Sequence, residues 1–172
     1  MAYTDWIPTM DSIKNKKNLS IIEFGLGDGT EFLINNFKNV HSFELADTKT
    51  WFDEANVKYA NSKNWTCEFA HFDNYGFYDY MLNLPQALLD KLVDLFSQSK
   101  YDIVFMDGGY HNRGQIANFI LNQFSPKAMI IHDINYAFQQ DMYDQIIVPE
   151  DYSFVDDTNG EGTRIYYKQG VL

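Results

Sequence analysis

Apolar runs and helical periodicity alternate along most of the chain. Runs rich in β-branched and aromatic residues predict buried strands, and apolar positions recurring at three and four residues predict helices. The strand-like segments are 19–24, 40–46, 65–69, 101–107 and 128–133. The helix-like segments are 30–37, 50–62, a stretch opening at Pro85 and carrying Leu88 to Phe96, and a stretch from Ile116 to Phe124. In the segment 50–62, Trp51, Ala55 and Tyr59 are expected on one apolar stripe. Repeated β-α units predict parallel strands with helices on both faces, because right-handed crossovers are the common connection.

The end of the chain follows a different pattern. Two strand-like runs, 152–155 and 163–168, are separated by the turn-rich segment DDTNGEG without a helix between them. Such a pair predicts an antiparallel hairpin. We therefore expect an α/β fold with a doubly wound, mainly parallel seven-stranded sheet and a C-terminal antiparallel hairpin. No repeat or Pro/Gly/Ser-rich linker divides the sequence, so we expect residues 1–172 to form a single domain.

The composition of the chain bears on its cellular location and on the kinds of partner that it can bind. The 172 residues are 45% hydrophobic, yet no apolar run approaches the roughly 20 residues of a membrane-spanning helix. The start lacks the order of a secretory signal and Cys67 is the only cysteine, which favours a cytoplasmic protein. The net charge of −11, with 13 Lys and Arg, argues against a nucleic-acid partner, because basic residues supply most of that affinity.

Three alternating glycines follow the first strand in IIEFGLGDGTEFL. Gly25, Gly27 and Gly29 stand where an open α/β sheet binds its ligand, and glycine lets a ligand approach the main chain closely. The dinucleotide fingerprint requires Gly or Ala at position 30, where this chain has threonine. Glu23 before the loop would repel a pyrophosphate and attract an ammonium group. The loop therefore argues against NAD.

An acid near the end of the second strand completes the pattern. Glu44 lies nineteen residues beyond Gly25, in the position from which a carboxylate accepts both hydroxyl protons of a ribose. Loop and acid together indicate a ligand of the adenosine type. The alternative for Glu44 is a solvated carboxylate at a strand end.

The segments IIEFGLGDGTEF and SFELA resemble the first two motifs of class I S-adenosylmethionine-dependent methyltransferases. That resemblance implies the seven-stranded Rossmann-like fold and S-adenosylmethionine as cofactor. It implies that the three glycines pass under the methionine and ribose, that Glu23 meets the amino group, and that Glu44 holds the ribose diol. Asp73, after the third strand, falls where the family often contacts adenine; a turn-forming aspartate is the alternative.

Acidic residues also end the fourth and fifth strands. Asp107 and Asp133 occupy the ends of the adjacent segments FMDGGYH and IIHDIN, and oxygen donors converging from neighbouring strands suit Mg²⁺. These segments resemble the small metal-dependent O-methyltransferases. The resemblance implies Asp107, Asp133 and Asn135 as ligands of a metal that orients the acceptor, with His111 as base, so His111 and Asp107 are our candidate catalytic residues. The alternative is that both aspartates cap loops and that His132 is a buried structural histidine.

These features predict an enzyme that transfers methyl from S-adenosylmethionine to a small-molecule acceptor, at oxygen and with metal assistance. Two alternatives stay open: an enzyme that cleaves S-adenosylmethionine without transfer, and a cofactor-binding subunit without chemistry of its own. Little sequence precedes the first strand, so a short loop or a partner subunit, as in a homo-oligomer, would have to exclude water from the reaction.

Overall fold

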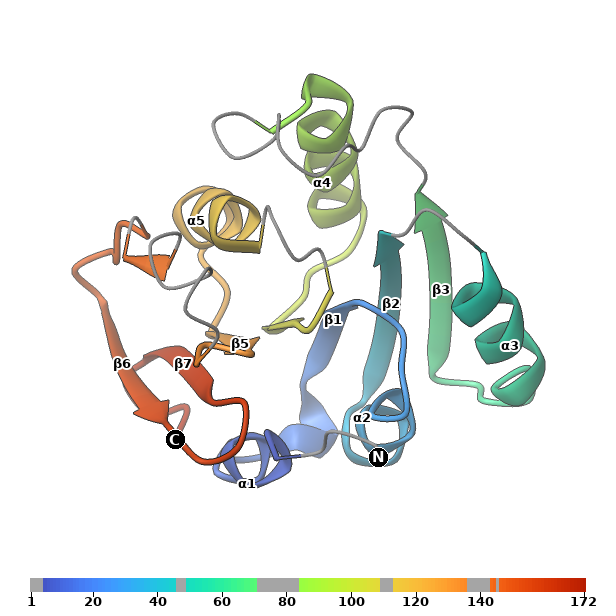
Figure 1. The fold of residues 1–172 in the computed structure, drawn as a ribbon, viewed down its shortest axis with the longest axis horizontal. Coiled ribbons are helices and arrows are strands. Elements are labelled where there is room, and N and C mark those ends of the chain that lie inside the picture. Colours follow the sequence, from blue (N-terminus) through green and yellow to red (C-terminus); the bar gives the residue numbers. More distant parts are fainter. Residues whose placement is uncertain (1–4, 46–48, 71–83, 109–112, 136–142, 145) are drawn as a thin grey trace.

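In a computed structural model, the chain forms one seven-stranded sheet flanked by helices (Figure 1). The structure describes residues 5–45, 49–70, 84–108, 113–135, 143–144 and 146–172. Within this described part, no helix combines the length and the hydrophobicity that crossing a bilayer requires.

The sheet confirms the predicted fold class. The strands are β1 (Ser20–Phe24), β2 (Asn39–Leu45), β3 (Trp65–Ala70), β4 (Ile103–Met106), β5 (Ala128–His132), β6 (Tyr152–Asp157) and β7 (Thr163–Lys168). Their order is β3-β2-β1-β4-β5-β7-β6, with parallel pairing from β3 to β5 and antiparallel pairing of β7 with both β5 and β6. The order reverses between β1 and β4, so the carboxyl ends of these two strands define the place where such sheets bind ligands.

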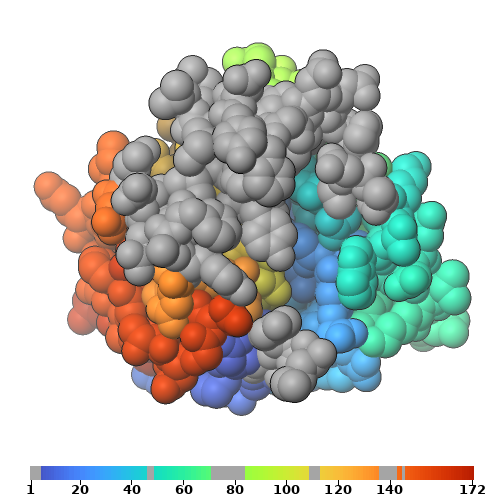
Figure 2. All heavy atoms as spheres, in the orientation of Figure 1, coloured from blue at the N-terminus to red at the C-terminus, as the bar shows by residue number. Residues whose placement is uncertain are grey.

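Both faces of the sheet are covered by apolar residues, as the strand alternation requires. One face carries Ile22 and Phe24 of β1 and packs against α4 (Gln86–Gln98) and α5 (Arg113–Phe124). The other carries Ile21 and packs against α1 (Ile7–Asp11), α2 (Thr30–Asn36) and α3 (Thr50–Lys58). A short 3-10 helix, η1 (Lys16–Asn18), precedes β1. Viewed as spheres, the α3–β3 region and the β6–β7 hairpin form opposite sides of the molecule (Figure 2).

Two details differ from the sequence prediction. The helix predicted over 50–62 ends at Lys58. Trp51, expected on the buried stripe with Ala55 and Tyr59, is 54% exposed, whereas Ala55 and Tyr59 are buried. The inward position of the first turn belongs instead to Phe52, which packs against Phe69 with ring centroids 5.6 Å apart. Residues eight apart lie about 80° apart around a helix, so Trp51 and Tyr59 cannot both point at one narrow contact.

Candidate functional site

The glycine loop meets the end of β4 through main-chain contact. Gly25 has a φ of +100°, and a Cβ atom there would lie 2.7 Å from the Gly108 nitrogen. The Phe24 carbonyl accepts hydrogen bonds from the amides of Asp107 and Gly108, at 2.9 and 2.6 Å. A glycine is therefore required at position 25 for two reasons: its backbone is left-handed, and a side chain would collide with Gly108. The close contact and the Phe24 hydrogen bonds hold the ends of β1 and β4 together.

The other two glycines have different surroundings. A Cβ added at Gly27 would meet no heavy atom within 4 Å among the residues that the structure describes. A Cβ at Gly29 would overlap Cζ2 of Trp6, so the bare Gly29 accommodates the N-terminal tryptophan. Gly27 is therefore the glycine whose open side remains available to a ligand.

Glu44 at the end of β2 organises the same loop. Its Oε2 accepts a hydrogen bond of 2.6 Å from the Leu26 amide, and its side chain is buried. Its other oxygen, Oε1, accepts no hydrogen bond from the residues that the structure describes. Burial raises the pKa of Glu44, and the Leu26 hydrogen bond offsets part of that rise. Glu44 thus joins β2 to the glycine loop and keeps one acceptor oxygen for a further donor.

Glu23 lies in a buried polar network below the loop. Thr30 Oγ1 is 3.0 Å from each of its carboxylate oxygens, and Ser42 Oγ donates to Oε2 at 2.6 Å. Trp65 Nε1 donates in turn to Ser42 Oγ at 2.9 Å. Burial raises the pKa of Glu23 to about 8, against the lowering effect of these hydroxyl donors. Without a cation beside it, Glu23 is mainly protonated at neutral pH.

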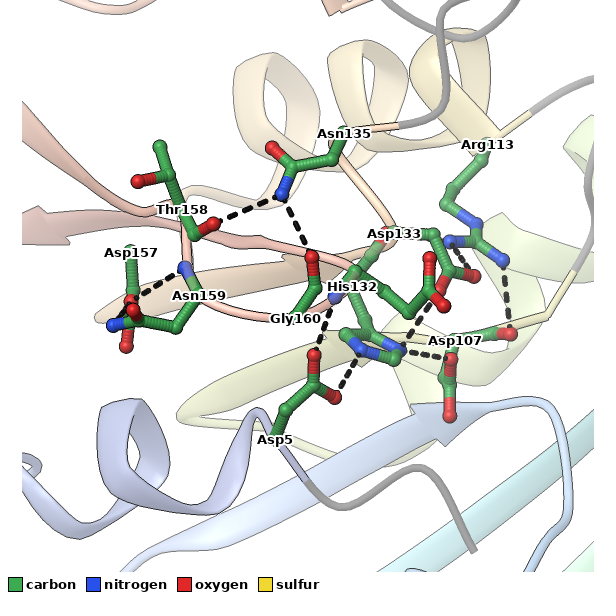
Figure 3. Close-up of polar contacts among 11 residues, drawn as sticks. Asp5, Asp107, Arg113, His132, Asp133, Asn135, Asp157, Thr158, Asn159 and Gly160 are labelled. Atoms are coloured by element: carbon green, nitrogen blue, oxygen red, sulfur yellow. Dashed lines mark hydrogen bonds and ion pairs between the residues drawn. The ribbon is translucent and has the colours of Figure 1, made fainter. Parts of the chain in front are cut away.

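Asp107 belongs to a second network, at the ends of β4 and β5 (Figure 3). His132 Nδ1 lies 2.8 Å from Asp107 Oδ1, and His132 Nε2 lies 2.8 Å from Asp5 Oδ1. Burial alone would lower the pKa of His132, but the hydrogen bond and charge of Asp107 outweigh it and raise that pKa. Asp5 also accepts the Glu161 amide at 2.6 Å, so the chain start, the β5 end and the β6–β7 loop meet here.

Asp133 is held by a fully buried arginine. Arg113 Nη1 donates to Asp133 Oδ2 at 3.0 Å, while Asp133 Oδ1 lies 3.2 Å from His132 Nδ1. The backbone of Asp133 is left-handed, with a φ of +62°. Ligand atoms of Asp107, His132 and Asp133 lie within 4.8 Å of one another, which is close enough for a shared metal ion. However, Asp133 Oδ2 already accepts from Arg113, and Asp133 Oδ1 lies beside His132 Nδ1. A divalent ion would have to displace Arg113 or His132 to reach these oxygens.

The remaining predicted residues lie apart from this network or outside the described part. The Asn135 amide nitrogen donates to the carbonyls of Thr158 and Gly160, at 3.1 and 2.9 Å, and its side chain points toward the β6–β7 loop (Figure 3). The structure therefore brings Asp107 and Asp133 together but turns the Asn135 nitrogen away from them. His111 and Asp73 fall outside the described residues.

Sequence reasoning missed Arg113 and Asp5. Arg113 carried one usable signal, because it is the only Lys or Arg between residues 101 and 126, a segment that contains the strand-end Asp107. An isolated cation in such a segment is a candidate partner for a buried carboxylate. Asp5 carried no comparable signal, since its contact with His132 joins residues 127 apart.

Comparisons with known proteins establish the fold. No protein-family model matches the sequence, and no curated protein matches it. Among solved structures, the S-adenosylhomocysteine-bound methyltransferase PaMTH1 of Podospora anserina has a TM-score of 0.61 at 10% identity, over 87% of this chain and 71% of that one. A putative caffeoyl-CoA O-methyltransferase from Staphylococcus aureus has a TM-score of 0.58 at 12% identity, over 94% and 79%. The 23S rRNA methyltransferase ErmE has a TM-score of 0.56 at 12% identity, over 99% and 69%. The chain therefore has the fold of class I S-adenosylmethionine-dependent methyltransferases.

Proposed function

We propose that this protein is an enzyme that transfers methyl from S-adenosylmethionine to an oxygen of a small-molecule acceptor. The observation that carries the proposal is the pairing of an open Gly27 with the available oxygen of Glu44 at the strand-order reversal. A ligand with a ribose diol fits this pair, because the bare main chain permits close approach and the carboxylate accepts hydroxyl protons. The PaMTH1 methyltransferase, which has the same fold, was solved with S-adenosylhomocysteine bound.

The acceptor side of the proposal rests on Asp107. Its side chain is partly exposed, and its Oδ1 is oriented by His132, which leaves Oδ2 for a proton from an acceptor hydroxyl. The putative O-methyltransferase among the similar structures is consistent with oxygen as the target. The similar structures also include an rRNA methyltransferase, but the net charge of −11 favours a small molecule over RNA.

Substitution of Gly27 by alanine tests the cofactor proposal. The added methyl meets no described protein atom and the backbone is not left-handed, so Gly27→Ala should keep the wild-type melting temperature without ligand. It should weaken S-adenosylhomocysteine binding by roughly tenfold or more, measured by calorimetry. NAD⁺ serves as the control ligand and should bind neither form. Unchanged S-adenosylhomocysteine affinity in Gly27→Ala, or no binding to the wild type, would contradict the proposed site.

Turnover is tested with labelled S-adenosylmethionine and simple phenols as acceptors. Label transferred to the phenol supports methyl transfer. Cofactor loss that needs no acceptor would favour a cleaving enzyme, and binding without loss or transfer would favour a cofactor-binding subunit.

A further inference from the structure

The guanidinium of Arg113 lies against Asp133, one of the two carboxylates that the sequence suggests as metal ligands. Arg113 has no exposed surface. Besides Asp133, it donates to three main-chain carbonyls: His132 at 2.5 Å, Asp107 at 2.9 Å and Gly108 at 3.2 Å. Arg113 therefore binds oxygens from the carboxyl ends of both β4 and β5, as a metal ion bound between the two strands would.

The surrounding chain is shaped around this cation. Asp133 adopts the left-handed backbone conformation, which is uncommon for a residue other than glycine, and its carboxylate meets Arg113. Arg113 opens α5, so the contact also ties that helix to the sheet. A planar guanidinium stays charged at any working pH and matches several oxygens at once. The negative charge of Asp133, which a divalent ion would otherwise neutralise, is thus neutralised by Arg113.

We infer that Arg113 is the resident cation of this edge and excludes divalent metals from the Asp107, His132 and Asp133 cluster. Binding of a metal there would place two further positive charges within a few ångströms of a buried guanidinium, or require its expulsion into solvent. The exclusion of metal stands independently of any reaction. The corollary that methyl transfer proceeds without metal rests on the proposed function.

Manganese binding tests the inference directly. The full-length chain is titrated with MnCl₂ without S-adenosylmethionine, and free Mn²⁺ is followed by electron paramagnetic resonance. The wild type should bind no Mn²⁺ at one site with a dissociation constant below roughly 0.1 mM, because the resident charge repels it. Arg113→Gln keeps amide donors and removes the charge, so it should bind Mn²⁺ about a hundredfold more tightly through the freed Asp133 carboxylate, Asp107 and His132.

Two variants control for charge and for loss of an arginine elsewhere. Arg113→Lys keeps the positive charge and should exclude Mn²⁺ like the wild type. Arg164→Gln removes a guanidinium that pairs with Asp156, at 2.7 and 2.9 Å, and not with a residue of this cluster, and should also leave Mn²⁺ binding unchanged. Circular dichroism establishes that each variant is folded.

A wild-type dissociation constant for Mn²⁺ below roughly 0.1 mM at one site would overturn the inference, and this arm needs no variant. A folded Arg113→Gln that gains no affinity would also overturn it, because the guanidinium would then not be what excludes the metal. Should Arg113→Gln fail to fold, the wild-type titration decides alone. Since S-adenosylhomocysteine binding is measured separately, failure of the methyltransferase proposal would leave these outcomes unaffected.

Discussion

Three carboxylates of the site owe their chemistry to their surroundings. Glu23 is surrounded by hydroxyl donors in the interior, and Asp133 faces Arg113. Glu44 holds the glycine loop with one carboxylate oxygen and keeps the other available. Desolvation raises the pKa of each, while donors and cations lower it to different extents. The same functional group therefore gives one mainly protonated acid, one loop-organising acceptor and one ion-pair partner.

The raised pKa of Glu23 predicts a pH dependence of stability. In the ligand-free protein its pKa of about 8 exceeds the ordinary value of 4.5, so the folded state retains a proton that the unfolded state releases. Stability from this group is complete below pH 4.5 and declines as the pH rises to 8. At about 1.4 kcal/mol for each tenfold change in proton affinity, the loss between pH 4.5 and pH 8 is on the order of 5 kcal/mol.

Urea denaturation at pH 5, 7 and 9 checks this prediction. Glu23→Gln cannot ionise, so the difference in unfolding free energy between variant and wild type should shift in favour of the variant as pH rises. Glu54→Gln, at an exposed position, provides the control and should follow the wild type. Parallel pH profiles for wild type and Glu23→Gln would refute the raised pKa.

Glu44 should contribute more to affinity than to folding. Glu44→Ala removes both the Leu26 acceptor and the proposed ribose acceptor, and should weaken S-adenosylhomocysteine binding by tens-fold, or about 1.5 to 3 kcal/mol. Glu44→Gln keeps a neutral acceptor for the Leu26 amide and should lose less. Calorimetry on both variants measures the effect, with Glu54→Gln again as the matched control. Wild-type affinity in Glu44→Ala would remove this residue from the site.

At the scale of elements, the glycine loop is built by contacts with segments distant in sequence. Gly25 meets Gly108 after β4, and Gly29 meets Trp6 beside α1. Trp6 is buried against Phe105 and Phe32, with centroid distances of 4.6 and 5.6 Å. The start of α2 is consequently fixed by the N-terminal segment as well as by the sheet.

A double-mutant cycle tests the contact between the N-terminal segment and α2. Gly29→Ala should destabilise the protein by about 1–3 kcal/mol, because its methyl overlaps a buried indole that has little room to move. In a Trp6→Ala background this penalty should largely disappear. Urea denaturation gives both values, and Gly27→Ala, whose methyl is accommodated, is the control. An equal penalty in both backgrounds would show that the indole is not what Gly29 accommodates.

At the scale of the whole molecule, the acidic charge should govern the choice of acceptor. With 24 Asp and Glu against 13 Lys and Arg, the chain has few cations to release counterions from a phosphate backbone and many anions to repel it. We expect no RNA binding tighter than roughly 100 µM at physiological salt, measured by fluorescence anisotropy with a labelled RNA hairpin. Micromolar binding that weakens steeply with salt would contradict this and favour an RNA acceptor.

Much of this architecture could be predicted from the order of the residues. Strand-like runs and helical stripes repeat strongly enough to predict all seven strands, and their alternation predicts the parallel sheet and the closing hairpin. Glu44 and the glycines could be assigned to one edge because carboxyl ends of parallel strands converge. Periodicity failed for Trp51, since a stripe of i, i+4 and i+8 drifts around the helix.

The fold, the acidic surface and the edge at which any ligand would bind follow from the amino-acid sequence alone, because they depend on local periodicity and summed charge. Only the tertiary structure decides which glycine faces open space, which glycine faces Trp6, and which cation meets Asp133. Those outcomes depend on contacts such as Asp5 with His132, across 127 residues, and on the burial of Arg113. Local sequence patterns carry no information about such pairings, since their energies arise from proximity and desolvation in the folded chain.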